Sequence, residues 1–598
     1  MAIDRSLARS GPQTWLLLAL LAAIVGTGCS RRTSQSPETS FEVSFPAAVH
    51  EQPITGRLFV IITRSNQQEP RLQIGDAPVF ATDIKRLAPG PWARMDSDTA
   101  GYPVNSLRDL PDGDYYVQAL LNIYTEFHRA DDHVLWLHMD QWEGQDLARS
   151  PGNLISEVKR VHLDPKSGYH EKLLLSKMIP PIEIPAETPW VKRLKFQSKL
   201  LSQFWGRPIY IGATVLLPKG YSNHPNRFYP VIYLQGHFSL GAPFGFKTEE
   251  DKNEKSWARD RQERAAKHLN FSEPPSYATA SGSLLNVETG YEFYQAWNSD
   301  DFPRVIVITF QHPTPYYDDS YTVNSANHGP AGAAIMNELI PYVEEHFRII
   351  HEPYARVLTG GSTGGWESLA LQVYHPEFFG GTWSFYPDSV DFRRYGDINL
   401  YTDDSAYTQP GGSEWLFGSS GWLPPPERYA IRHLDGQPGF TWRQYDQMLA
   451  VVGDRGRSGI DESTVYSAVA ADGYPAQLWD TRTGKINHEV ADYMREQGYD
   501  LRDYMERNWP SIGSQLAGKL HVICGDADSF YANLSVYLLE DFLENTKNPY
   551  YAGSFAYGRP LKGHGWQPTT NAELVKEMSR YITRNAPAGE NPKMWHYR

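Results

Sequence analysis

Cysteine is scarce in this chain. Only Cys29 and Cys524 are present among 598 residues. If Cys29 is modified or removed with a leader, one thiol remains and an internal disulfide is excluded; a chain of this length does not need one to fold. The motifs H-E-x-x-H, C-x-x-C and G-x-x-x-x-G-K-[ST] are also missing. The sequence therefore predicts no metal and no cofactor.

Excess positive charge is missing as well. The formal net charge is −14, and a protein that binds nucleic acid needs a basic face to neutralise phosphates. We therefore expect no nucleic-acid partner. Apolar residues make up 41% of the chain, which is enough for folded structure throughout, and the length predicts two or three domains. The sequence leaves the oligomeric state open.

Long apolar runs are limited to the N-terminus. The run Trp15–Val25 follows Arg5 and Arg9 and is too short for a comfortable transmembrane helix. Residues 1–29 therefore read as an export signal. The small residues before Cys29 resemble a bacterial lipobox, which predicts lipidation of Cys29; a plain cut by signal peptidase is the alternative.

An exported protein has two expected features, its location outside the cytoplasm and a tether after the export signal. The protein is predicted to be a periplasm-facing or outer-membrane lipoprotein, or to be secreted. Residues 30–40 are rich in Ser, Arg, Thr, Gln and Pro and predict a flexible tether.

The chain divides into a β-rich part and an α/β part. Residues 41–185 hold short apolar or alternating runs separated by turn residues, which predicts an all-β, immunoglobulin-like sandwich. Its role is open: it could space the enzyme from a membrane, shape the substrate cleft or mediate a dimer. Residues 178–187, rich in proline, predict a linker. From about 190 to 598, strand patterns alternate with helix patterns, which predicts a largely parallel sheet covered by helices. About 130 residues at 387–516 interrupt this rhythm and predict a lid over the substrate pocket.

The stretch Gly360-Gly361-Ser362-Thr363-Gly364 carries the strongest functional signal. A β-rich run precedes it and a helix-compatible run follows. Strand, G-x-S-x-G and helix together form the nucleophile elbow of the α/β-hydrolases. A serine there needs a histidine to take its proton and an acid to orient that histidine. Ser362 is therefore the candidate nucleophile.

The acid and the base should follow in the chain order Ser, Asp, His. Asp528 stands in the loop after a late strand and is the favoured acid, with Asp526 as its competitor. Asp388 and Asp391, after an earlier strand, form a third option. His564 is the candidate base, since it follows the last strand and is flanked by glycines that let the backbone bend.

An oxyanion hole requires two backbone N–H groups near the serine. One should come from Thr363, the residue after the nucleophile. The other should come from the loop after the early buried strand, where we assign His237, with Phe238 as the alternative. The side chain of His237 is a further candidate for substrate contact.

The α/β part resembles the bacterial putative-esterase family that is related to esterase D, feruloyl esterases and enterochelin esterases. The resemblance rests on Leu217–Tyr221, Tyr229–Leu234, Glu338–Glu344, the elbow, and His375–Phe379. It covers roughly residues 205–390 and 515–585 and implies ester hydrolysis through Ser362, Asp528 and His564. The chain departs from the family where Gln235-Gly236 replaces the usual His-Gly, in its long insertion and in its N-terminal β domain.

These observations predict an exported serine esterase. Its substrates are expected to be small-molecule or glycan-linked esters, with carbohydrate-linked or aryl acyl groups, because the predicted lid is rich in Trp and Tyr. Two alternatives remain open. One is a serine peptidase on the same fold, and the other is a non-catalytic cell-surface binding protein that reuses the fold.

Overall fold

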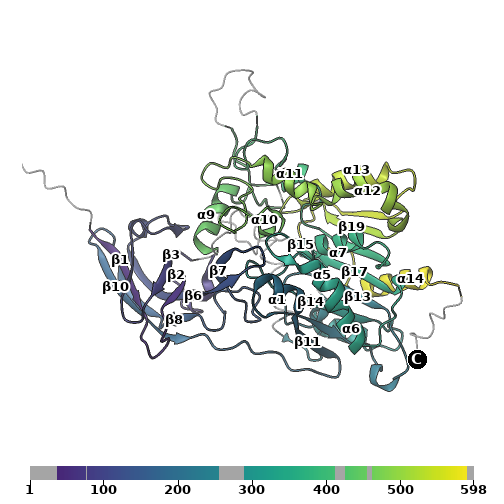
Figure 1. The fold of residues 1–598 in the computed structure, drawn as a ribbon, viewed down its shortest axis with the longest axis horizontal. Helices are drawn as coiled ribbons and strands as arrows, with labels where there is room; N and C mark the ends of the chain where they lie inside the picture. Colours follow the sequence, from purple (N-terminus) through teal and green to yellow (C-terminus); the bar gives the residue numbers. More distant parts are fainter. Residues whose placement is uncertain are drawn as a thin grey trace, which may run out of the picture.

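The computed structural model describes residues 37–75, 77–252, 254, 288–410, 425–434, 436–453 and 461–588. These residues form a β-rich N-terminal region and a larger α/β region, which lie side by side (Figure 1). Each region is built on its own sheet. The predicted export signal and Cys29 lie outside the described residues.

The N-terminal region is an antiparallel-rich assembly with the strand order β4-β1-β10-β8-β6-β2-β3-β5, to which β7 and β9 add by pairing with β6. Strand β10 pairs with β1 along its first half and with β8 along its second half, where the register shifts between Leu175 and Lys177, and so joins two groups of strands. The all-β character is confirmed. The strands are β1 Thr39–Ser44, β2 Ile54–Thr63, β3 Val79–Leu87, β4 Ala93–Asp96, β5 Gly101–Tyr102, β6 Gly113–His128, β7 Val134–His138, β8 Leu154–Ser156, β9 Lys159–Leu163 and β10 Tyr169–Met178.

One boundary of the predicted tether differs from the structure. Strand β1 begins at Thr39, inside the segment 30–40. Thr39 and Ser40 pair with Tyr169 and His170 of β10 and are buried. Their pairing in a sheet, rather than their polar composition, decides their conformation.

The second sheet has the order β11-β12-β14-β13-β17-β18-β19-β20. Strands from β14 to β20 in this order are parallel, while β12 is antiparallel to both of its neighbours. This order and direction are those of an α/β-hydrolase, which confirms the predicted fold. The strands are β11 Val191–Ser198, β12 Ile209–Leu216, β13 Val231–Gln235, β14 Ile306–Gln311, β17 Arg356–Gly361, β18 Gly381–Phe385, β19 Leu520–Gly525 and β20 Ser554–Gly558. A two-stranded ribbon adds β15 Asn324–Ser325 and β16 Gly329–Pro330.

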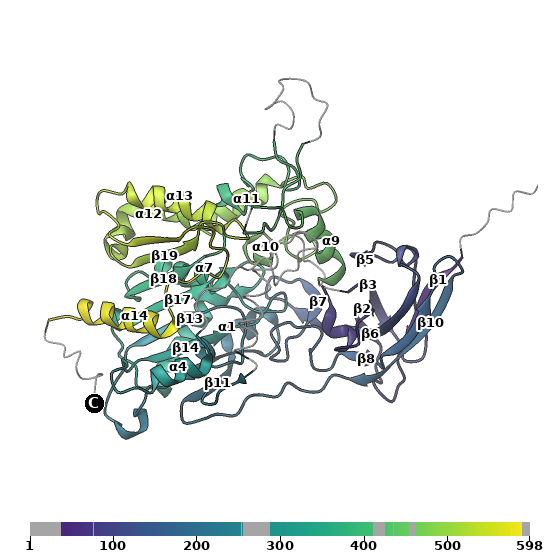
Figure 2. The same ribbon diagram turned by 180° about the vertical axis from the view of Figure 1, so that it is seen from behind.

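Helices cover this sheet on both faces (Figures 1 and 2). One long helical stretch runs from Ala331 to His346, with a π-helical turn in its middle. The helices are α1 Lys199–Trp205, α4 Gly290–Trp297, α5 Ala331–Ala334, η5 Ile335–Leu339, α6 Ile340–His346, α7 Thr363–Tyr374, α9 Trp442–Val452, α10 Asp461–Tyr466, α11 His488–Glu496, α12 Leu501–Leu516, α13 Ala532–Glu544 and α14 Asn571–Asn585. Short 3-10 turns are η1 Pro70–Gln73, η2 Leu107–Asp109, η3 Tyr221–Asn223, η4 Pro243–Gly245, η6 Pro353–Ala355 and η7 Phe392–Arg394.

The long insertion between β18 and β19 holds α9 to α12. Helix α12 packs against α7 and α13, so it serves as the covering helix that a compact hydrolase would have at this point. The extra material is therefore the part before α12. Within it, α9 turns toward the N-terminal region and lies against β3 and β5.

The continuous apolar run of β2 has a structural reason. Leu58, Val60 and Ile62 face the core of the N-terminal region, and Phe59 and Ile61 face a second apolar cluster that includes Val451 of α9. A strand buried on both faces needs apolar residues at every position rather than at alternate ones. The N-terminal sheet is thus covered by part of the insertion.

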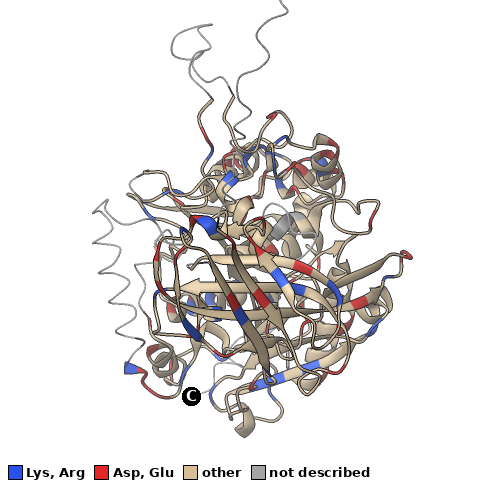
Figure 3. Ribbon diagram, turned by 90° about the vertical axis from the view of Figure 1, so that its left-hand side faces the viewer, with Lys and Arg blue, Asp and Glu red and all other residues tan. Residues whose placement is uncertain are grey.

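The exposed strands of the N-terminal region carry both signs of charge (Figure 3). Lys159 pairs with Glu171, and Lys172 pairs with Glu42. Such mixed pairs do not form the basic face that nucleic acid requires. Among the described residues, no helix has both the length and the apolar composition that a membrane crossing demands.

Candidate active site

Ser362 lies at the sharp turn between β17 and α7. Its backbone has φ 58° and ψ −124°, a region that a non-glycine residue adopts at a cost of order 1–3 kcal/mol. Its N–H donates to Phe385 O of β18 at 3.1 Å, and its carbonyl accepts from Asp388 N at 3.3 Å and Trp366 N at 3.0 Å. These backbone hydrogen bonds, from β18, the loop after it and α7, therefore hold the strained turn in place.

The glycines of the elbow are required by close backbone contacts. A Cβ atom on Gly364 would lie 2.2 Å from Gln235 O, and one on Gly360 would lie 2.3 Å from Gly364 O. A Cβ on Gly361 would meet the Tyr386 hydroxyl at 2.3 Å. Real Cβ contacts are longer, so strand, helix and neighbouring strand approach this closely only because side chains are absent.

His564 contacts the serine directly. Its Nε2 atom lies 2.9 Å from Ser362 Oγ, and its Nδ1 atom lies 2.9 Å from Asp528 Oδ2. The loop that carries it stands against the end of β19, where a Cβ on Gly525 would be 2.1 Å from Lys562 O. The predicted nucleophile, base and acid are thus brought together by three loops at the carboxyl edge of the sheet.

The Asp528 carboxylate is held from several sides. Its Oδ1 accepts Phe530 N at 2.9 Å and Ala532 N at 3.3 Å, and its backbone carbonyl accepts Arg432 Nε at 2.9 Å. Asp528 is fully buried. Asp526, its competitor, instead accepts Lys562 N at 3.3 Å, so the structure brings Asp528 and not Asp526 to His564.

Asp388 contacts the serine rather than the histidine. Ser362 Oγ lies 3.3 Å from Asp388 Oδ1, while Thr363 Oγ1 and Tyr321 OH donate to Asp388 Oδ2 at 2.9 and 3.0 Å. Asp391, the other early candidate, pairs with Arg393. Neither residue takes the position of an acid behind His564.

Thr363 and His237 flank the serine. Thr363 is the first residue of α7, where helix N–H groups lack intrahelical partners and the helix dipole is positive. His237 follows β13, whose last carbonyl, Gln235 O, lies against the elbow glycines. The ring of His237 lies 3.4 Å from Thr363 Oγ1, measured from Nε2. Phe238 packs its ring on Trp142 of the N-terminal region.

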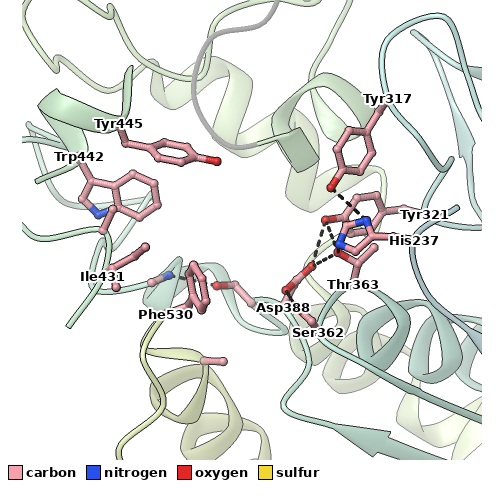
Figure 4. Close-up of a pocket in the computed structure, with 14 residues that line it drawn as sticks. His237, Tyr317, Tyr321, Ser362, Thr363, Asp388, Ile431, Trp442, Tyr445 and Phe530 are labelled. Carbon is pink, nitrogen blue, oxygen red and sulfur yellow. Dashed lines mark hydrogen bonds between the residues drawn. The ribbon is translucent and has the colours of Figure 1, made fainter. Parts of the chain in front are cut away.

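A cavity opens above Ser362 between two different walls (Figure 4). One wall is polar and includes Asp388, His237 and Tyr317. The opposite wall is aromatic and comes from the insertion, with Trp442 and Tyr445 of α9. Phe530, from the loop of Asp528, also lines the cavity. The insertion thus contributes to the pocket, as expected for a lid.

His237, a residue of the polar wall, belongs to an ion cluster. His237 Nδ1 lies 3.2 Å from Asp318 Oδ1 and 3.3 Å from Asp319 Oδ2. In the described part of the chain these three side chains form the group whose donor atoms lie within metal-ligand reach of one another. The imidazole ring already pairs with both carboxylates, and the arrangement is accounted for as a salt bridge.

Comparison with known proteins finds a family match in the α/β region. Residues 209–452 match the model of a family described as "Putative esterase". The α/β region of this chain therefore contains a segment that is similar to this family, and the match supports a carboxylic-ester hydrolase. Ser362, Thr363 and His237 lie inside the matched segment, whereas Asp528 and His564 follow it. The esterase domain was thus recognised correctly from its sequence.

Individual relatives are distant. The uncharacterized protein YbbA of Bacillus subtilis (strain 168) is 28% identical over 127 residues, which cover 18% of this chain and 51% of that protein, or about half its length. A ferulic acid esterase from Anaeromyces mucronatus is 13% identical, with a TM-score of 0.28, over 68% of this chain and 95% of its own. An S-formylglutathione hydrolase from Agrobacterium tumefaciens is 11% identical, with a TM-score of 0.31. The match covers 67% of this chain and 99% of the hydrolase.

The surroundings of His564 favour the protonated form of its imidazole and raise its pKa. Burial lowers the pKa of His564, but the charge and the hydrogen bond of Asp528 outweigh it, and the net pKa is raised above 6.5. Tyr386 and Phe530 pack against the imidazole with centroid distances of 4.8 Å each. These rings fix the imidazole and keep solvent from its faces.

Burial and charge also set the protonation of the polar wall. Although burial opposes it, hydrogen bonds and charge attraction from Asp318 and Asp319 raise the pKa of His237 strongly. Burial raises the pKa of Asp319 to about 7. Beneath them, burial holds the pKa of Glu367 well above its usual value. The two aspartates thus favour the charged form of His237, whose side chain is half exposed, and burial favours the protonated form of Glu367.

Sequence reasoning missed most of the polar wall. Asp318, Asp319, Tyr317 and Tyr321 follow β14, a strand that carries no member of the expected triad. Their clustering, Tyr-Tyr-Asp-Asp-Ser-Tyr at 316–321, was the available signal. Its position after a parallel strand, at the edge where ligands bind in open α/β sheets, could have indicated a role in the pocket.

Proposed function

We propose that the protein is an exported serine esterase. Ser362 attacks the ester carbonyl, His564 takes the serine proton and later protonates the leaving alcohol, and Asp528 orients the imidazole. The amides of Thr363 and His237 stabilise the oxyanion. Water then hydrolyses the acyl-enzyme by the same steps in reverse order.

The observation that supports this proposal most is the pair of contacts made by His564. One ring nitrogen reaches the serine hydroxyl and the other reaches the buried carboxylate, both at 2.9 Å. A hydrogen-bonded nucleophile, base and orienting group are what nucleophilic catalysis by serine requires. A protein that only bound ligands would have no need for this strained and crowded turn.

The substrate class rests on the cavity. The aromatic wall formed by Trp442 and Tyr445 suits stacking on an aryl group or on the C–H face of a sugar. We propose carbohydrate-linked or aryl acyl esters as substrates. Export, with lipidation of Cys29 as an anchor, rests on the N-terminal sequence alone.

A panel of esters tests the proposal. We expect hydrolysis of acetyl and feruloyl esters, and weaker hydrolysis of long-chain aliphatic esters, measured by product release with purified protein. Activity on long-chain lipids alone would refute the substrate class. Cleavage of aminoacyl amides without any ester hydrolysis would favour a peptidase instead.

The raised pKa of His564 predicts the pH profile. The base acts when neutral, so kcat/KM falls as the pH drops through the pKa of His564. Because Asp528 raises that pKa, the acid limb should have its midpoint above 6.5. Rates of a neutral ester, measured from about pH 5 to 9, check this. A midpoint clearly below that of an ordinary histidine would contradict the role of Asp528.

A further inference from the structure

The N-terminal region contacts both walls of the cavity above Ser362. Its contacts reach the aromatic wall through α9 and the polar wall through the loops that follow β13 and β14. The contact with α9 lies apart from the machinery that attacks the ester, whereas the loop after β13 also carries the proposed oxyanion amide of His237.

Arg57 of β2 holds the end of helix α9. Its Nη2 donates to Ala450 O at 2.7 Å and Val451 O at 3.1 Å, and its Nε donates to Val451 O at 3.2 Å. Asp83 of β3 accepts Nη1 at 2.7 Å and orients the guanidinium. A cation at the C-terminus of a helix also complements the negative end of its dipole. Arg57 therefore acts as a C-terminal cap provided by another region.

Apolar packing surrounds this cap. Val451 is 3% exposed and belongs to the cluster of Phe59, Ile61 and Val79 on the outer face of the N-terminal sheet. The arginine itself is 9% exposed. A buried hydrogen-bonded cation tolerates little displacement, because its donors would lose partners without reaching water.

The other end of α9 faces the cavity. Trp442 and Tyr445 line the cavity, and they lie across it from Ser362 (Figure 4). Helix α9 has 11 residues, a length of roughly 16 Å at 1.5 Å per residue. A short rigid rod thus links the N-terminal sheet to the aromatic wall.

The polar wall is braced by the same region. Trp142 packs its ring on Phe238, next to His237, with a centroid distance of 5.4 Å. Gln145 Nε2 donates to Thr314 O at 2.7 Å, in the loop that leads to Tyr317. The backbone of Trp136 also meets the Tyr474 hydroxyl of the insertion at 3.1 and 3.3 Å.

We infer that the N-terminal β region sets the width of the substrate cavity, with Arg57 as the positioning residue for the aromatic wall. This inference rests on the proposed esterase function. Of the three roles left open by the sequence, these contacts favour the shaping of the substrate cleft. The region selects substrates by holding Trp442 and Tyr445 at a set distance from Ser362, and it leaves the chemistry of the serine unchanged.

Replacement of Arg57 by alanine tests this inference through KM. Loss of the cap frees the end of α9, so KM for a bulky aryl ester such as methyl ferulate should rise roughly 5- to 20-fold, as expected for one or two lost hydrogen bonds to a charged group. The KM for methyl acetate, which is too small to need the aromatic wall, should change less than about twofold, and kcat should stay within that range for both esters.

Matched variants separate positioning from general damage. Arg57→Lys should recover part of the loss, because an ammonium can still reach one carbonyl. Arg160→Ala removes an exposed arginine of the same region that pairs with Asp114, and it should leave both KM values unchanged. Labelling of Ser362 in Arg57→Ala by a small fluorophosphonate, at the wild-type rate, would show that the serine and histidine remain in place.

Two outcomes would overturn the inference. Equal changes in KM for the large and the small ester would show that Arg57 acts only on stability, and no change for either would show that α9 does not depend on its cap. A wild-type protein that hydrolyses no ester would refute the proposed function instead, so the two failures are distinguishable.

Discussion

Ser362→Ala is expected to abolish ester hydrolysis, with a fall in kcat of at least about 10⁴-fold. The hydroxyl is the only group at the elbow that His564 Nε2 reaches at 2.9 Å, and alanine leaves no atom to form the acyl-enzyme. Hydrolysis of an activated acetyl ester, together with labelling by a fluorophosphonate probe, measures the loss. Both should disappear together.

Ser389→Ala is the matched control for this experiment. Ser389 lines the same cavity, but its hydroxyl oxygen accepts Gly396 N at 3.0 Å and takes no part in the contacts of His564. This variant should keep its probe labelling. If Ser362→Ala were still labelled, or Ser389→Ala were not, the assignment of the nucleophile would be wrong.

Asp528→Asn is expected to lower kcat by about 10⁴-fold, the size of effect seen when the orienting acid of a serine triad is neutralised. The carboxylate accepts the Nδ1–H of His564, and this leaves Nε2 free to take the serine proton. An amide can donate to Nδ1 instead, and the ring then carries its proton on the nitrogen that faces Ser362. The shape of the site is kept, so circular dichroism and thermal unfolding should remain close to those of the wild type.

Two other aspartates provide the comparison for Asp528→Asn. Asp526→Asn keeps a side-chain oxygen that can still accept Lys562 N, the 3.3 Å contact of Asp526, so kcat should fall less than about tenfold, in line with the weakening of one hydrogen bond. Asp388→Asn changes a residue that contacts Ser362 and Thr363, and its effect should be smaller than that of Asp528→Asn. A larger loss for either variant than for Asp528→Asn would move the role of the acid to that residue.

The elements that the sequence predicted well are those with strong local signals. The strands from β12 to β20 are short apolar runs bounded by turn residues, and α14 Asn571–Asn585 is an amphipathic run with Thr570 as its N-cap. The positions of Ser362, Asp528 and His564 followed from chain order, because each comes directly after a strand of a parallel sheet and such strand ends meet at one edge.

The parts that could not be predicted depend on long-range contacts. Nothing local in β2 indicates that Phe59 and Ile61 pack against Val451, nearly 400 residues away in the chain. The ion pairs of Asp318 and Asp319 could not be predicted either, because they form only where His237, about 80 residues earlier in the chain, approaches them. The use of Thr39 and Ser40 in β1 depends on a partner strand more than 120 residues later.

The crowding at the elbow limits how this protein can be altered by engineering. At four glycines, 360, 361, 364 and 365, an added Cβ atom would lie within 2.4 Å of a backbone oxygen or, at Gly361, of the Tyr386 hydroxyl. Substitutions at these four positions should disrupt the turn, whereas the residues of the aromatic wall line the cavity, where other side chains have room. Libraries should therefore leave the turn untouched and diversify positions 442 and 445.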